Sequence, residues 1–129
     1  MVILDTSIII DHLRRSQGKK TNLMSLASQI AKENLAISTI TIQELYEGQS
    51  TKHKDKETSL LSTVTPLKIL PYTYETAQLA GEIARDLKQP IEFTDAAIAA
   101  TAIINGALLA TLNKKHFQSI RDLELWDKF

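Results

Sequence analysis

The chain has 129 residues with 43% hydrophobic residues, which fits one domain with a real core and excludes wholesale disorder. It has no cysteine, so disulfides, thiolate metal sites and a cysteine nucleophile are excluded; with no basic leader and no apolar run near the ~18 residues of a membrane span, we expect a cytoplasmic protein without membrane contact. Fifteen basic and fifteen acidic residues give zero net charge, so a nucleic-acid enzyme of this composition needs a local basic patch or a metal ion.

The first half of the chain predicts two strands and three helices. The apolar run before Asp5 and the one before Ser38 are short and uninterrupted, as in buried strands. Helical spacing of apolar residues follows each run. In order, we predict a strand over 2–5, a helix capped by Thr6 or Ser7 and ending at about Arg15, a basic turn over 14–20, and then a helix over 21–34, a strand over 35–37 and a helix over 39–48.

The second half continues the same alternation. Residues 49–58 are polar and fit either a loop or the solvated tip of a helical hairpin. The predicted elements that follow are a helix over 59–65, a strand over 66–70, a helix through 80–87, an alanine-rich helix over 94–105 capped by Gly106, a strand over 107–111 and an edge strand over 123–125. Short apolar strands separated by helices indicate a parallel sheet covered on both faces. We therefore predict one α/β domain over 1–129, with a mainly parallel sheet of four to five short strands.

Four polar residues are predicted to gather at the carboxyl edge of this sheet, where ligands bind in parallel α/β folds: Asp5, Glu44, Asp95 and Asn113. Each also has a purely structural explanation. Asp5 precedes a helix and could cap it, and Thr41-x-x-Glu44 fits a capping box. Asp95 suits the first turn of a helix, and Asn113 suits a turn or a helix start.

The neighbours of the acids favour a functional site. Asp5 follows Val-Ile-Leu, Glu44 lies between two apolar residues, and Asp95 precedes Ala-Ala-Ile-Ala-Ala. Such surroundings indicate a partly buried cleft, where carboxylates repel one another and their pKa values rise unless a cation compensates. Oxygen ligands without cysteine or histidine favour a hard ion, so we predict Mg²⁺ or Mn²⁺.

Four segments carry a family resemblance, and their order and spacing make it specific. They are Val-Ile-Leu-Asp5-Thr-Ser, Ile37-Ser-Thr-Ile-Thr-Ile-Gln-Glu44-Leu-Tyr-Glu-Gly48, Phe93-Thr-Asp95-Ala-Ala-Ile-Ala-Ala and Leu109-Ala-Thr-Leu-Asn113-Lys-Lys-His-Phe117. Together these segments resemble the PIN-domain ribonucleases, and most of all the VapC toxins of bacterial and archaeal toxin–antitoxin pairs. The resemblance covers essentially the whole chain.

The resemblance implies a PIN-like fold and a metal-dependent endoribonuclease. In it, Asp5, Glu44 and Asp95 match the acidic metal-binding positions, and Asn113 matches a fourth position that is Asp in many relatives. One or two Mg²⁺ or Mn²⁺ ions are implied, with water as the attacking group. Glu44 is expected to hold a water or a second ion or to act as a base, and the Thr6 or Ser7 hydroxyl to position a water or orient Asp5.

The resemblance also implies partners. The expected partners are a VapB-like antitoxin, seated on the helices over 39–48 and 59–65, a second copy of the chain, and tRNA, rRNA or mRNA as substrate. Candidate RNA contacts are the basic residues near the predicted cleft, namely Lys114, Lys115, Arg14 and Arg15. His116 is expected at the surface and Phe117 in the core, and the aromatic residues Tyr72, Tyr74 and Trp126 are expected to pack rather than to stack on bases.

Two alternatives stay open on the sequence. One is a PIN-like module that binds RNA or protein but has lost turnover with the fourth acid. Retention of the other three acids argues against it. The second is a phospho-receiver or haloacid-dehalogenase-like domain, which also places an Asp at a strand end. Those folds need a further acid near Asp5, and the next acid in this chain is Asp11.

Overall fold

The structure, a computed structural model, describes residues 1–15 and 18–129. Four strands form one parallel sheet in the order β3-β2-β1-β4. The strands are β1 (Val2–Leu4), β2 (Leu35–Ser38), β3 (Lys68–Leu70) and β4 (Leu108–Ala110). Because β1 lies inside the sheet, the residue that follows it, Asp5, emerges between β2 and β4.

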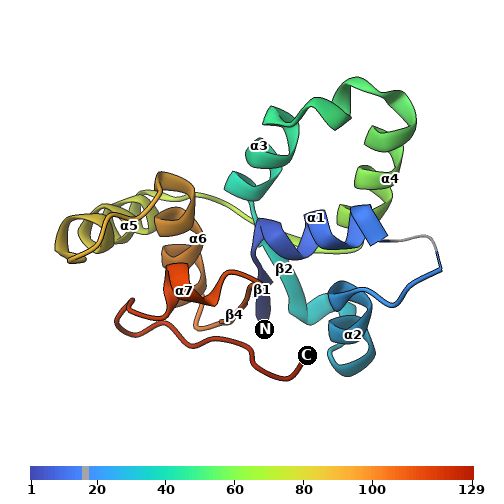
Figure 1. Ribbon diagram of the computed structural model, residues 1–129. Coiled ribbons are helices and arrows are strands. Elements are labelled where there is room, and N and C mark those ends of the chain that lie inside the picture. The colour runs from blue at the N-terminus through green and yellow to red at the C-terminus, as the bar shows by residue number, and fades with distance from the viewer. Residues whose placement is uncertain (16–17) are drawn as a thin grey trace.

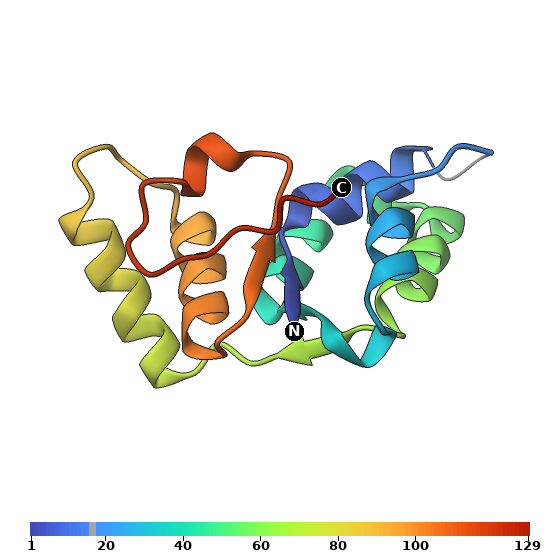
Figure 2. The same cartoon turned by 90° about the horizontal axis from the view of Figure 1, so that it is seen from below.

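The α-helices are α1 (Thr6–Arg15), α2 (Asn22–Gln29), α3 (Thr39–Glu47), α4 (Lys54–Val64), α5 (Tyr74–Asp86), α6 (Phe93–Ile104) and α7 (Lys114–Phe117). Two short 3₁₀ helices, η1 (Lys32–Asn34) and η2 (Gln49–Lys52), join them. Helices α1, α2 and α4 lie on one side of the sheet, and α5, α6 and α7 lie on the other (Figure 1; Figure 2 shows the same division from below). Helix α3 contacts both α1 and α6, so it joins the two sides.

Alternation along β1 divides the core in two. Val2 and Leu4 pack with apolar side chains of α1, α2 and α4, whereas Ile3 packs with α6 and Phe117. This is the two-residue period of a strand covered on both faces. The predicted α/β architecture with a parallel sheet of four strands is confirmed, as is the buried position of Phe117.

Helix α6 owes its alanine-rich sequence to its place in the fold. Seven consecutive residues, from Ala96 to Ala102, are buried, and the helix lies between α5, α3 and β4. Small side chains allow several elements to approach one helix closely. Gly106 ends this segment with a φ of 61°, as the predicted cap requires.

Several predicted boundaries are wrong for identifiable reasons. Helix α1 already begins at Thr6, so Thr6 and Ser7 lie in its first turn and do not cap it. The helix predicted over 21–34 ends at Gln29, because Ile30 is extended and packs against the first core. The polar residues 54–58 form the start of α4, so the segment 49–58 is the tip of a helical hairpin.

The predicted edge strand over 123–125 is reduced to one parallel bridge between Leu109 and Leu125. Asp122 has a φ of 67°, which turns the backbone just before this segment. The segment then makes one pair of backbone hydrogen bonds with Leu109 of β4. Over the described ranges, no helix combines the length and the apolar character needed to cross a membrane.

Candidate active site

Asp5 is the most deeply buried acid of the site, with 4% of its surface exposed. Its Oδ1 accepts a hydrogen bond from the Thr6 backbone N–H at 2.9 Å. Its Oδ2 accepts from the Ser7 hydroxyl at 2.8 Å and from the Thr111 hydroxyl at 2.7 Å. Three donors from α1 and the end of β4 therefore fix the orientation of this carboxylate.

Glu44 is oriented by α1. The Thr6 hydroxyl donates to Glu44 Oε1 at 2.5 Å and lies 3.1 Å from the buried Thr41 hydroxyl. The capping-box explanation of Glu44 is wrong, since α3 is capped by Ser38, whose hydroxyl accepts from the Ile40 N–H. Glu44 lies in the second turn of α3 and faces the residue that follows Asp5.

Asp95 lies in the first turn of α6, and its side chain is 15% exposed. The pKa of Asp95 is raised to about 6. Burial is the main cause, and the negative charge of Asp5 is the second. His116 opposes this rise, because its Nδ1 lies 3.2 Å from Asp95 Oδ2. The carboxylate that follows β1 thus acts electrostatically on the one in the first turn of α6.

Asn113 occupies the position before α7, but its side chain makes no capping hydrogen bond. Its backbone N–H donates to the Thr111 hydroxyl at 2.9 Å, and the Leu112 N–H donates to Ser7 Oγ at 3.1 Å. These bonds join the turn after β4 to the hydroxyls that hold Asp5. The turn therefore places Asn113 beside the same edge of the sheet.

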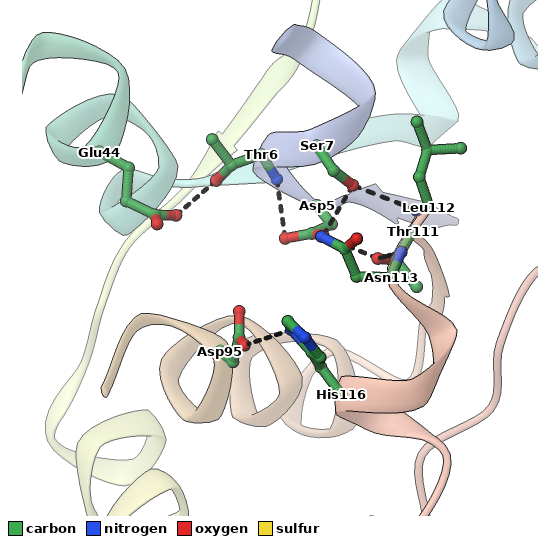
Figure 3. Close-up of polar contacts among 9 residues, drawn as sticks. All are labelled: Asp5, Thr6, Ser7, Glu44, Asp95, Thr111, Leu112, Asn113 and His116. Carbon is green, nitrogen blue, oxygen red and sulfur yellow. Dashed lines mark hydrogen bonds and ion pairs between the residues drawn. The ribbon is translucent and has the colours of Figure 1, made fainter. Parts of the chain in front are cut away.

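Figure 3 shows the carboxylates of Asp5, Glu44 and Asp95 around one space, with Asn113 and His116 entering from α7 and the turn before it. Within residues 1–15 and 18–129, no three acidic or histidine side chains are grouped closely enough to hold a metal ion. The chemistry of the donors nevertheless fits a hard cation. Asp5 and Asp95 offer carboxylate oxygens as metal ligands. Besides burial, the negative charge of Asp5 raises the pKa of Asp95, and a bound cation would relieve this repulsion.

Two features of the site were not predicted from the sequence: the part of Thr111, and the contact of His116 with Asp95. His116 is at the surface as expected, with 53% of its side chain exposed, but it also contacts Asp95. Thr111 ends the strand predicted over 107–111. A hydroxyl at the carboxyl end of that strand was the signal available in the sequence. Neither contact follows from spacing alone, because each depends on the direction in which a side chain leaves a turn.

The predicted RNA contacts lie in two places. Lys114 and Lys115 are exposed in α7, next to the site. Arg15 is paired with the buried Asp11 at 3.2 Å, and Arg14 lines a cavity that also includes Glu44. The four residues are therefore not one patch.

The aromatic residues differ from expectation at one position. Trp126 packs against the first core, and the Tyr72 ring lies 6.5 Å from that of Phe93. Tyr74 is 84% exposed, so the expectation that it packs is wrong. It begins α5, where its side chain extends from the first turn into solvent.

The chain has a parallel sheet with carboxylates at its carboxyl edge. It therefore belongs to the class of α/β proteins that bind their ligands at this edge. The family model described as PIN domain matches residues 2–123. Ribonuclease VapC1 of Methanocaldococcus jannaschii is 34% identical over 133 residues, covering 98% of this chain and 88% of the relative. Ribonuclease VapC10 of Mycobacterium tuberculosis is 31% identical, covering 96% and 91%. The chain belongs to the PIN-domain family, in the group of the VapC ribonucleases.

A solved structure supports the same assignment. The chain superposes on a chain of the complex VapBC2 from Rickettsia felis, bound to a DNA fragment from their promoter, with a TM-score of 0.81 and 28% identity. The match covers 98% of each chain. The resemblance stated from the four segments is thus confirmed over the whole domain.

Proposed function

We propose that the protein is a cytoplasmic endoribonuclease that depends on Mg²⁺ or Mn²⁺ and acts as the toxin of a toxin–antitoxin pair. The observation that carries this proposal is the gathering of the Asp5, Glu44 and Asp95 carboxylates around one space (Figure 3), where burial and the negative charge of Asp5 raise the pKa of Asp95. The relatives named Ribonuclease VapC support RNA as the substrate class. tRNA, rRNA and mRNA all remain within that class.

Asp5 and Asp95 would hold the metal ion, with Glu44 and Asn113 completing its surroundings through one or two further contacts. When bound, a divalent ion lowers the pKa of a coordinated water and offsets the charge of the scissile phosphate. The chain's own part is to keep the ligands in position. Thr6, Ser7 and Thr111 hold Asp5 by three hydrogen bonds, so it cannot rotate without breaking them.

Glu44 has a separate part. The Thr6 hydroxyl occupies Oε1, which leaves Oε2 as the atom that accepts a proton from water or contacts a second ion. Water is the attacking group in this proposal, and the in-line departure of a ribose oxygen completes the hydrolysis of the phosphodiester. Asn113, as a neutral amide, orients water without adding negative charge to the site.

Cleavage of structured RNA with Mg²⁺, with Mn²⁺ and with chelator tests the proposal. We expect Asp5→Asn and Asp95→Asn to lose activity by 10²-fold or more, on the order of removing a metal ligand, while urea unfolding shows that both variants fold. Asp127→Asn is the matched control, because Asp127 is exposed and lines none of the cavities around the site. Activity in chelator, or equal activity of all four proteins, would contradict the nuclease assignment and favour a PIN-like binding module.

The proposed antitoxin site is a cavity of about 650 Å³ between α1, α3 and α4. Its lining includes the apolar residues Ile10, Leu13, Leu45 and Leu60, and also Glu44 of the candidate active site. An apolar peptide segment seated there would approach the active site directly. The complex VapBC2 of Rickettsia felis supports a VapB-like antitoxin as the occupant. The homodimer that the family resemblance implies is part of the same proposal.

We expect Leu13→Asp to weaken binding of the cognate antitoxin by about 10-fold or more, since it buries a charge in an apolar contact. Isothermal titration calorimetry measures the affinity. Leu61→Asp is the control, because Leu61 is exposed on α4 and does not line the cavity. Equal affinities of Leu13→Asp and the parent would place the antitoxin elsewhere.

A further inference from the structure

A second cavity adjoins the active site at Asp95 and His116. It has a volume of about 580 Å³ and lies between α7 and the connection that joins α5 to α6. Both boundaries lie at the same end of the molecule in Figure 2. Asp95 and His116 line this cavity, so it opens directly onto the site of the proposed reaction.

The size and lining of the cavity suit one nucleotide. Its volume falls within the range of pockets that enclose small organic ligands. Pro90 and Ile91 provide an apolar surface on which a base can lie, and Gln89 and Ser119 provide hydrogen-bonding groups. Lys88 and Lys115 lie in the lining as partners for phosphate.

The acids of the cavity differ in what they already bind. Asp86 pairs with Arg85 through two contacts, at 2.7 and 2.9 Å, and Asp95 contacts His116. Among the cavity-lining residues that the structure describes, Glu92 is the acid with no hydrogen bond or ion pair, and it does not cap α6 although it precedes this helix. The Glu92 carboxylate is therefore available to a ligand.

We propose that this cavity binds an unpaired nucleotide of the RNA substrate next to the scissile phosphate, and that Glu92 makes it favour guanine. The inference rests on the proposed ribonuclease function. Guanine offers two adjacent N–H donors, N1 and N2, to the two oxygens of one carboxylate, and the other RNA bases offer no such pair. Unpaired nucleotides can be turned out of the strand so that proteins contact these edges.

Binding of free nucleotides tests the cavity without any cleavage. The parent protein in chelator is titrated with GMP, AMP, CMP and UMP, and backbone amide shifts are followed by NMR. We expect GMP to shift amides of residues 87–92 and 115–119 and to bind about 5-fold or more tightly than AMP, and we expect Glu92→Gln to remove this difference. Glu75→Gln, an exposed acid of α5 outside the cavity, should keep it.

Cleavage of an RNA pool with a randomised unpaired loop tests the same cavity in the reaction. We expect the parent to prefer guanine at one position flanking the cut and Glu92→Gln to cut with the four bases within about 2-fold of one another. Lys88→Ala should raise KM, whereas Lys32→Ala on the far side of the molecule should not. A guanine preference that survives in Glu92→Gln, or GMP shifts outside the cavity, would overturn the proposal.

Failure of the proposed function and failure of the guanine subsite give different experimental results. A parent that cuts no RNA in Mg²⁺ or Mn²⁺ would overturn the proposed function, and the nucleotide titration would then decide the cavity by itself. A parent that cuts RNA without a guanine preference would leave the proposed function standing and overturn the guanine subsite. Absence of any nucleotide effect on residues 87–92 and 115–119, with shifts there on adding the cognate antitoxin, would assign the cavity to the antitoxin.

Discussion

Thr111 follows β4 and connects the end of this strand to the Asp5 carboxylate of the candidate active site. Its hydroxyl donates to Asp5 Oδ2 and accepts from the Asn113 N–H, and the residue is buried. Removal of this hydroxyl leaves both partners short of a hydrogen bond in a place that water does not freely reach. The cost therefore appears in stability and in the orientation of Asp5.

We expect Thr111→Val to lower the free energy of unfolding by about 1–3 kcal/mol and to weaken Mn²⁺ binding by about 10-fold. Urea unfolding and calorimetry measure the two effects. Thr111→Ser keeps the hydroxyl and should restore most of the metal affinity. Thr101→Val is the matched control, because the buried Thr101 hydroxyl donates to the Ala97 carbonyl within α6 and should affect stability alone. Equal loss of metal affinity in Thr101→Val would contradict a specific role for Thr111.

Asp95 makes metal-free stability depend on pH. Its pKa is about 6 in the folded protein, mainly because of burial, against an ordinary value of 3.8. Between these two values the folded protein binds more protons than the unfolded chain, so the free energy of unfolding falls as pH rises from about 4 to about 6. Above that range the full penalty of the buried charge is present.

Asp95→Asn removes this penalty while keeping a side chain of the same shape. We expect the metal-free variant to be more stable than the parent by about 1–2 kcal/mol near pH 7.5, and the gain to disappear near pH 4. Urea unfolding in chelator at the two pH values measures it. Asp86→Asn should show no gain, since Arg85 lowers the pKa of that exposed carboxyl. A gain that is equal at both pH values would contradict this origin.

The candidate site shows what spacing can predict at the scale of residues. That Asp5, Glu44 and Asp95 lie around one space could be predicted, because each acid stands beside apolar residues and follows or precedes a strand of the parallel sheet. The contact of His116 with Asp95 was not found, since it depends on how α7 turns relative to α6. The roles of Asp5, Glu44 and Asp95 as metal ligands are predictions that metal-binding measurements test.

Glycine positions provide a matched pair of tests at the scale of helices. Gly106 has a φ of 61° at the end of α6, a conformation that residues with a Cβ adopt at a cost. Gly81 lies inside α5, where a Cβ would meet open space and no left-handed φ is needed. The same substitution should therefore have opposite effects at the two positions.

We expect Gly106→Ala to lower the free energy of unfolding by about 1 kcal/mol and Gly81→Ala to raise it by about 0.5–1 kcal/mol. Gly106→Asn should cost less than Gly106→Ala, because asparagine tolerates the left-handed region. Thermal or urea unfolding measures all three. A loss on Gly81→Ala would show that this face of α5 is packed in the folded protein.

Helices and strands were predictable where an apolar pattern marks them. The apolar pattern predicts β1, β2 and α6, because each of these contains an uninterrupted buried run. It missed the start of α4, where residues 54–58 are polar and solvent-exposed on a helical hairpin. It overextended α2, because Ile30 keeps the helical spacing but packs in an extended conformation.

At the scale of the whole molecule, zero net charge requires that RNA binding depend on local features. The site carries carboxylates at its centre, and exposed lysines of α7 lie beside it. Without metal, these carboxylates repel phosphate and offset the attraction of the lysines. A bound divalent cation offsets most of this negative charge, so the attraction of the lysines is opposed less.

We therefore expect weak binding of single-stranded RNA in chelator, and binding at least about 10-fold tighter in Ca²⁺, which takes the same oxygen ligands. Two phosphate contacts by Lys114 and Lys115 predict a slope of about −1.4 for log affinity against log salt. Replacing both lysines by alanine should flatten this slope, as fluorescence anisotropy measures. Replacing Lys19 and Lys20, an exposed lysine pair in the basic turn after α1, is the matched control and should leave it unchanged. Equal slopes for the two double variants would mean that RNA does not cross α7.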